Sequence, residues 1–204
     1  MPKKAFTVIE IVFIVVIMGI IGYIATPKLL SKNNIKEASK QVLLHMKHTQ
    51  QLALQDELYN PNEPDWYKKR WSIQFKKCRD SDDFFYIIFS NLDKGFNIDQ
   101  DDEPATDPLN GRSLYNNGNC RTIQEKNSPN VLLTEKFDIQ DTFTNTCGLG
   151  ATLTFDKLGR LHGGNKELYS NLITDDCNIT FYDSKDNNFT ISIKKETGYI
   201  EILE

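Results

Sequence analysis

The sequence predicts an α+β fold, in which a long N-terminal helix packs on an antiparallel β-sheet domain. Three features predict it: an apolar run near the N-terminus, apolar residues at spacings of three and four beyond it, and alternating polar and apolar residues in the second half. They divide the chain into a short basic leader (1–5), an apolar transmembrane half of the helix (6–26), an amphipathic stalk half (27–58) and the β domain (59–204).

The apolar run is long enough to cross a bilayer. Residues 6–26 carry one charge, and at about 1.5 Å per residue they span roughly 30 Å, the thickness of a hydrocarbon core. Lys3 and Lys4 precede the run and favour a cytoplasmic N-terminus, with the rest of the chain outside. A cleaved secretory signal fits less well, because Tyr23 stands where such a signal has a small residue. An uncleaved membrane anchor stays open as an alternative.

The one charge in this run is Glu10. A carboxylate inside an apolar span costs about 2.5–3.5 kcal/mol, and no Lys, Arg or His lies within residues 6–26 to pair with it. A cut between Ala5 and Phe6 would create an α-amine one helical turn from Glu10. The amine of one copy could then pair with Glu10 of its neighbour in a filament. The alternative is a glutamate that reaches the headgroups from near the membrane interface.

Residues 3–10, Lys-Lys-Ala-Phe-Thr-Val-Ile-Glu, resemble the class III signal of type IV prepilins and pseudopilins. The resemblance implies cleavage after Ala5 by a prepilin peptidase and methylation of the new Phe6 amine. It also matches Gly19 and Pro27 to positions where such helices often carry these residues. The family usually has glycine where this chain has Ala5.

The resemblance implies a structural role and no enzymatic activity. The expected function is that of a minor pilin or pseudopilin in a type IV pilus-like filament or a type II secretion pseudopilus. The expected partners are other pilin subunits, the prepilin peptidase and the inner-membrane assembly platform, with the β domain in the periplasm. A minor pilin that binds DNA or a surface is an alternative, although a net charge of −4 gives little attraction for nucleic acid. An uncleaved, signal-anchored periplasmic protein is another.

The stalk half is predicted to be an amphipathic helix. Pro27 removes a backbone donor and should kink the helix without ending it. Beyond it, one predicted face comprises Ile35, Ala38, Val42, Met46, Thr49 and Ala53. Prolines at positions 61 and 64 should end the helix at about residue 58. His45 and His48 have a metal-ligand spacing, but without an apparent third ligand we expect packed or solvated side chains.

The period of two predicts strands after the prolines. They cover residues 71–75, 84–89, 151–155, 178–182, 189–193 and 199–202, and the last three form a meander because turn residues join them. Residues 155–160 and the final hairpin ending at residues 196–200 resemble the H-type minor pseudopilins and related minor pilins.

Four widely spaced cysteines, none in a CxxC pair, predict two disulfides on the far side of a membrane. Of the three possible pairings we predict the sequential one, Cys78–Cys120 with Cys147–Cys177. The alternative is four buried free thiols.

Two further patterns predict modification or binding sites. Acidic residues crowd between positions 91 and 107, and Ca²⁺ could bind Asp93, Asp99, Asp101 and Asp102, although a solvated acidic loop is the simpler interpretation. Asn178 and Asn188 each stand in an Asp-x-Asn-x-Thr pattern that resembles the extended N-glycosylation sequon of some bacteria, and Asn188 is the favoured acceptor because it adjoins a turn. Asp, Asn and Thr are also ordinary hairpin-end residues.

Overall fold

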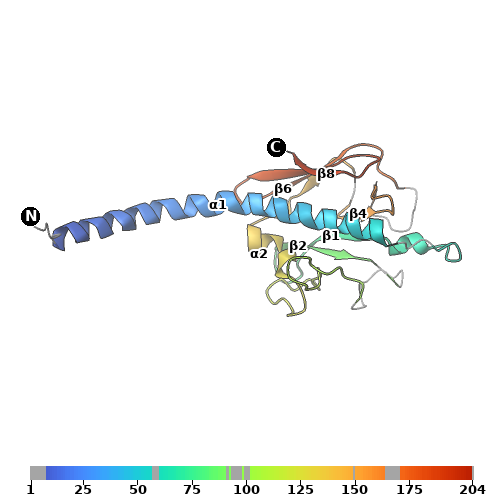
Figure 1. The fold of residues 1–204 in the computed structure, drawn as a ribbon, viewed down its shortest axis with the longest axis horizontal. Coiled ribbons are helices and arrows are strands. Elements are labelled where there is room, and N and C mark those ends of the chain that lie inside the picture. The colour runs from blue at the N-terminus through green and yellow to red at the C-terminus, as the bar shows by residue number, and fades with distance from the viewer. Residues whose placement is uncertain are drawn as a thin grey trace, which may run out of the picture. The chain divides into compact units, whose positions relative to one another are not determined.

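The computed structural model describes the chain except for residues 1–7, 57–59, 91, 93–97, 99–101, 149, 164–170 and 204, and except for the side chains of residues 22–33. It divides into two compact units, residues 1–34 and residues 35–204. Helix α1, Val8–Gln55, contributes its first part to the first unit and its second part to the second unit (Figure 1). Most of the stalk half of the predicted helix is therefore part of the same compact unit as the strands.

The structure corrects the predicted transmembrane half. Within the described ranges, no helix combines the length and the apolar character that crossing a membrane requires. In the first unit, the described apolar side chains extend from Val8 to Ile21. The helix rises roughly 20 Å over these residues, whereas a hydrocarbon core is roughly 30 Å thick. We therefore do not assign a transmembrane helix.

The second unit contains two antiparallel sheets, which also corrects the predicted single sheet. The first has the strand order β2-β1-β4-β5 and the second β3-β6-β7-β8. The strands are β1 Ser72–Lys77, β2 Phe84–Phe89, β3 Thr144–Asn145, β4 Thr152–Phe155, β5 Leu161–His162, β6 Cys177–Tyr182, β7 Asn188–Ile193 and β8 Ile200–Leu203. Of the short helices, η1 Trp66–Lys69 precedes β1, whereas η2 Pro129–Val131 and α2 Leu133–Phe137 lie between β2 and β3.

The predicted C-terminal meander is confirmed as β6-β7-β8. Strands β6 and β7 pair in a register that sets Thr180 opposite Thr190, and these two hydroxyls lie 2.8 Å apart. The turn after β6 closes through Asp186, whose φ of 62° suits the short polar side chains found at such positions. All six strands that the periodicity predicted are present within one to two residues at their ends.

An aromatic cluster joins the two sheets. Phe75 of β1 and Phe181 of β6 have ring centroids 5.3 Å apart, and Phe143 lies 5.5 Å from Phe75. Phe189 stacks on Phe181 at 4.9 Å. Such ring pairs add about 0.5–1.5 kcal/mol each beyond the burial of their area, so the contact of Phe75 with Phe181 stabilises the packing of the two sheets.

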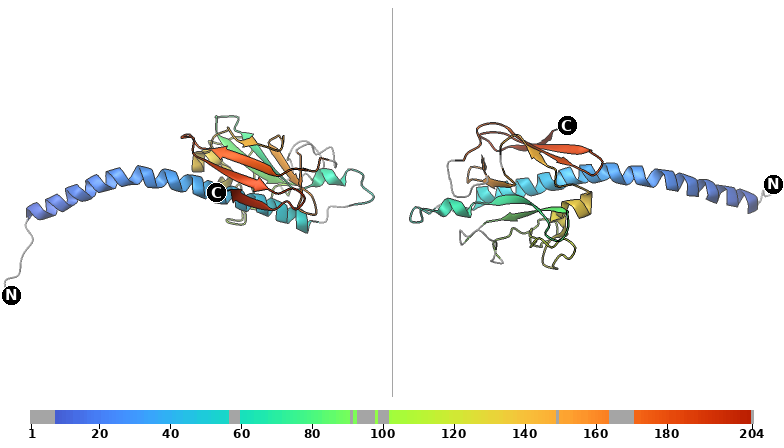
Figure 2. Two further views of the ribbon diagram at one scale, coloured as in Figure 1. Left: turned by 90° about the horizontal axis from the view of Figure 1, so that it is seen from above. Right: turned by 180° about the vertical axis from the view of Figure 1, so that it is seen from behind.

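The second part of α1 packs on this core along its predicted face. Ala38, Val42, Met46 and Thr49 are fully buried and Ala53 is nearly so. In Figures 1 and 2 this part of the helix runs along both sheets. The last helical residue is Gln55, a little before the predicted end.

Candidate assembly surface

The N-terminal part of α1 presents apolar side chains on all of its sides. Every residue from Val8 to Ile21 is exposed, including Val8 at 80% and Phe13 at 68%. A surface helix of a soluble protein has one apolar stripe and a polar face, whereas a helix that is apolar all round needs apolar surroundings. Burial of such side chains contributes about 25 cal/mol per Å². We call Val8–Ile21 the apolar segment; it is a candidate surface for packing against an apolar partner.

Two of the predicted assembly residues lie in the apolar segment. Glu10 lies in the first turn of α1, where the positive end of the helix dipole favours a carboxylate. A Cβ added at Gly19 would meet no atom of the described chain within 4 Å, so packing within this chain does not require a glycine there. Helix α1 continues through Pro27, although the side chain of Pro27 lies outside the described set. Ala5 and Phe6 lie entirely outside the described residues.

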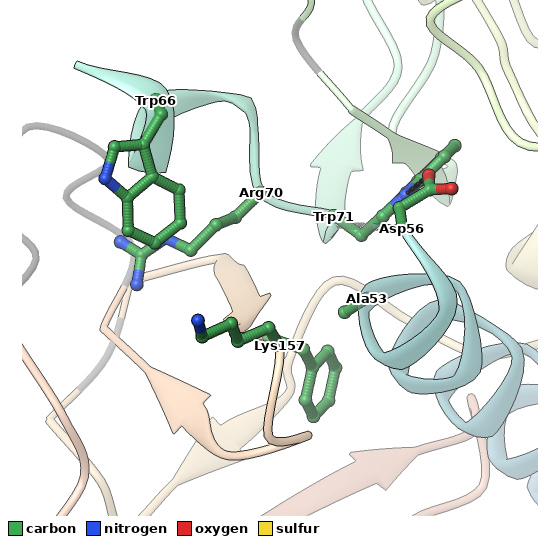
Figure 3. A pocket seen from close by; sticks show the side chains of 7 residues that line it. Ala53, Asp56, Trp66, Arg70, Trp71 and Lys157 are labelled. Carbon is green, nitrogen blue, oxygen red and sulfur yellow. Dashed lines mark hydrogen bonds between the residues drawn. The ribbon is translucent and has the colours of Figure 1, made fainter. Parts of the chain in front are cut away.

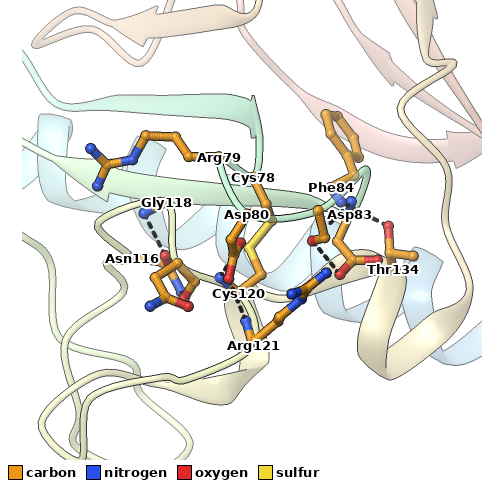
Figure 4. The surroundings of a disulfide bond; sticks show 12 residues. Cys78, Arg79, Asp80, Asp83, Phe84, Asn116, Gly118, Cys120, Arg121 and Thr134 are labelled. Atoms are coloured by element: carbon orange, nitrogen blue, oxygen red, sulfur yellow. Dashed lines mark hydrogen bonds between the residues drawn. A yellow bond between two sulfur atoms is a disulfide. The ribbon is translucent and has the colours of Figure 1, made fainter.

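The two predicted disulfides are both present, with the sequential pairing. Cys78 and Cys120 have Cα atoms 5.9 Å apart, and Cys147 and Cys177 have Cα atoms 5.0 Å apart. The first bridge ties the end of β1 to the long connection between β2 and η2 (Figure 4). The second ties the segment after β3 to the start of β6.

Asp80 lies beside the first disulfide. Its carboxylate accepts hydrogen bonds from the backbone N–H groups of Cys120 (3.0 Å) and Arg121 (3.2 Å), and the bond from Cys120 is the main reason that the pKa of Asp80 is lowered (Figure 4). Cys78, Asp80 and Cys120 therefore place three potential metal ligands close together. Cysteine binds a metal as the thiolate, however, and the two sulfurs here form a disulfide with each other. We therefore interpret this group as a structural cross-link.

The predicted calcium loop lies mostly outside the described residues. Asp93, Asp99 and Asp101 lie outside the described residues, whereas Asp102 is described and is exposed. The neighbouring Glu103 is buried, and its carboxylate accepts the backbone N–H of Leu92 at 3.0 Å. Calcium binding here stays a prediction.

A polar network is buried where α1 meets β2 and the connection after it. His45 Nδ1 lies 2.5 Å from the hydroxyl of Tyr86, and His45 Nε2 lies 3.5 Å from Asp107 Oδ1. Asp107 Oδ2 accepts from Ser128 Oγ (2.5 Å) and Asn130 Nδ2 (2.8 Å). The side chains of His45 and Asp107 are fully buried. The contacts of His45 with Tyr86 and Asp107 thus link α1 to segments far away in the sequence.

Burial and hydrogen bonding set the charge states of this network. Burial lowers the pKa of His45 to about 4, although Asp107 acts in the opposite direction, so the imidazole is neutral at pH 7. Burial alone would raise the pKa of Asp107, but hydrogen bonds from Ser128, Leu109 and Asn130 outweigh it and lower this pKa. Burial raises the pKa of Tyr86.

These residue types also occur in catalytic triads, but the geometry here differs. The hydroxyl of Ser128 donates to Asp107, on the side of the carboxylate away from His45, and all three residues are fully buried. A triad needs a serine next to the histidine and open to substrate. The network is therefore structural.

A second set of contacts joins α1 to one turn of each sheet. Gln50 Nε2 donates to the carbonyl oxygens of Gly159 (2.7 Å) and Gly198 (2.6 Å). Gly159 lies in the β4–β5 turn with a φ of +74°, and Gly198 lies in the β7–β8 turn with a φ of +66°. A Cβ at Gly198 would lie 1.9 Å from the Gly159 oxygen. We call this contact of Gln50, Gly159 and Gly198 the three-way junction.

A small cavity lies at the C-terminal end of α1. Figure 3 shows Trp66, Arg70 and Lys157 directed toward it, and the indole N–H of Trp71 donates to Asp56 at 2.5 Å. Its volume of about 10 Å³ is room for one water molecule. The cavity is too small for a substrate or an organic ligand.

No family model, curated protein or solved structure matches this chain.

The predicted glycan acceptors occupy different environments. Asn188 is exposed at the start of β7, directly after the turn, whereas Asn178 is half-buried inside β6 with a buried side-chain oxygen.

The sequence patterns did not predict the buried network or the three-way junction. Their members are single polar residues on elements far apart in the chain, and a period of two or 3.6 carries no information about such pairs.

Proposed function

We propose that this protein is a structural subunit of a type IV pilin-like filament, a minor pilin or pseudopilin, and not an enzyme. The observation that supports this most is the apolar segment, which is exposed on every side and carries Glu10 in its first turn. The prepilin-like residues 3–10 precede and overlap it. A subunit that is anchored in a filament by packing of its N-terminal helix needs an apolar surface of this kind.

The proposal also assigns the partners and the place of assembly. The partners are other pilin or pseudopilin subunits, the prepilin peptidase and the assembly platform at the bacterial inner membrane. The second unit would work on the periplasmic side, since two disulfides persist in an oxidising compartment. Modification of Asn188 by a glycan stays a prediction that the intact mass of the native protein would test.

Processing is the first test. The mature protein should begin at methylated Phe6, and Ala5→Leu should block cleavage because the peptidase site needs a small residue. Ala5→Gly is the matched control and should be cleaved at least as well as the natural chain. Mass spectrometry of the N-terminus reads the result. An intact Met1 end in cells with an active prepilin peptidase would contradict the proposal.

Glu10 is the second test. Glu10→Leu removes the carboxylate that the amine of the adjacent subunit would contact, so we expect most of the incorporation into filaments to be lost. Val12→Leu, an apolar change two residues away, is the control and should incorporate normally. The measurement is the amount of each variant in sheared, purified filaments. Equal amounts of the Glu10 variant and the control would rule out the pairing.

A further inference from the structure

A row of lysines and leucines, interrupted by one glutamine, runs along the exposed face of α1 in the second unit. Its positions follow steps of three and four, so they lie on one side of the helix: Lys36, Lys40, Leu44, Lys47, Gln51 and Leu54. We call this row the lysine–leucine stripe. It bears three positive charges and no negative one, on a chain whose net charge is −4. The row is opposite in sign to the protein as a whole.

Apolar and concave features flank the stripe. At one end Leu54 is 53% exposed, and it adjoins the turn of Leu158, which is 60% exposed. Lys47 Nζ lies 5.7 Å from the ring centre of Tyr199, which is 56% exposed. At the other end a cavity of about 260 Å³ is lined by Glu37, Lys40, Gln41, Leu44, Lys136 and Phe137. The stripe thus offers cations beside apolar contact area, and Glu37 offsets one charge at the cavity.

The second unit also has an acidic edge, formed by Asp82, Asp138, Asp141 and Asp186. Asp82 is almost fully exposed and lies 2.8 Å from Lys77, whose pKa is raised mainly by Asp82 and in part by Asp141. Asp138 accepts a hydrogen bond from Ser184, in the turn that contains Asp186. Lys77 and Lys185 offset part of the negative charge. The four carboxylates come from the β1–β2 turn, the segment after α2 and the β6–β7 turn.

We propose that the lysine–leucine stripe of one copy binds the acidic edge of a second copy. The argument is charge complementarity between two different surfaces of one chain, with leucines that supply apolar contact around the ion pairs. A contact between two different surfaces can repeat from copy to copy and so suits a filament. The inference rests on the proposed function, because it specifies how the second units of adjacent subunits meet.

Zero-length cross-linking of the full chain tests the contact. Unlabelled and ¹⁵N-labelled protein are mixed in non-ionic detergent and treated with a carbodiimide, which joins a lysine to a carboxylate only in direct contact. We expect cross-links of mixed isotope between Lys40 or Lys47 and Asp82 or Asp141. They should fade in 0.5 M NaCl, where the screening length falls to roughly 4 Å. Their absence at low salt would overturn the inference.

A charge swap provides the decisive variant. Lys40→Glu with Lys47→Glu should weaken self-association of the full chain at low salt about tenfold or more, as sedimentation measures it, since like charges then face each other. Asp82→Lys with Asp141→Lys should do the same, and mixing the two double variants should restore association. Arg112→Glu with Lys126→Glu is the control, because it changes the net charge as much as the lysine variant does, at exposed positions outside both surfaces. It should have no effect.

The same variants distinguish a contact between copies from binding to a membrane. If anionic phosphatidylglycerol vesicles bind the natural chain but not the lysine variant, and self-association is unchanged, the stripe binds membranes and the inference is wrong. If mixing the two variants fails to restore association, the inference is also wrong. The processing and Glu10 tests do not involve these residues, so they can succeed while this contact fails.

Discussion

Gly198→Ala should destabilise the second unit by about 4 kcal/mol. The new Cβ would lie 1.9 Å from the Gly159 oxygen and 2.7 Å from Gln50 Nε2, so the three-way junction has to open. Three costs add up: about 1 kcal/mol for a non-glycine residue at positive φ, about 1–3 kcal/mol for overpacking, and about 1 kcal/mol for hydrogen bonds lost by Gln50. Urea unfolding of the full chain measures the change, with tryptophan fluorescence as the probe.

Both tryptophans, Trp66 and Trp71, belong to the second unit, so the fluorescence reports on it alone. Gly111→Ala is the matched control. Gly111 also has a positive φ, of +74°, but a Cβ there would meet no described atom within 4 Å. It should therefore cost only about 1 kcal/mol. If the two variants lose the same stability, the close approach of the two turns is wrong.

Acidification from pH 6.5 to pH 4 should remove up to about 3 kcal/mol of stability through His45. The pKa of this residue is about 4 in the folded chain and 6.5 ordinarily, so the unfolded chain binds more protons between these values. The free energy of unfolding keeps the full contribution of His45 above pH 6.5 and loses it as the pH falls toward 4. Each pKa unit corresponds to about 1.4 kcal/mol.

His45→Gln tests the assignment, because an amide can keep hydrogen bonds to Tyr86 and Asp107 but does not titrate. We expect this variant to be less stable at pH 7 and to show a much flatter dependence between pH 6.5 and 4.5. The lowered pKa of Asp107 acts below its ordinary value of 3.8, outside this window. His48→Gln is the control and should keep most of the pH dependence, because burial, and not the nearby His48, is the largest cause of the lowered pKa of His45. A steep dependence in the His45 variant would assign it to other groups.

The periodicity predicted the local structure well and the long-range pairing poorly. The strands at Phe84–Phe89 and Cys177–Tyr182 and the buried face of α1 each follow a period that is visible within one segment. Strand β1, however, pairs with both β2 and β4, and no local pattern specifies the second partner. Local patterns therefore predict one sheet where two are present.

Two other features of the structure also escaped prediction because no local sequence pattern specifies them. Strands β3 and β5 contain two residues each, too few to show any alternation. The contact of Gln50 with two glycine carbonyls depends on turn conformation, which the helix sequence does not encode. The disulfide pairing was predictable because the sequential pairing closes loops of 42 and 30 residues, whose combined length is smaller than in either alternative pairing.

The disulfides have a consequence for proteolysis. A protease that cuts anywhere between Cys78 and Cys120, or between Cys147 and Cys177, leaves both fragments covalently attached. The first interval contains the acidic residues between positions 91 and 107. A nicked molecule would migrate as one species until it is reduced. A chain built this way stays in one piece after cleavage inside either interval.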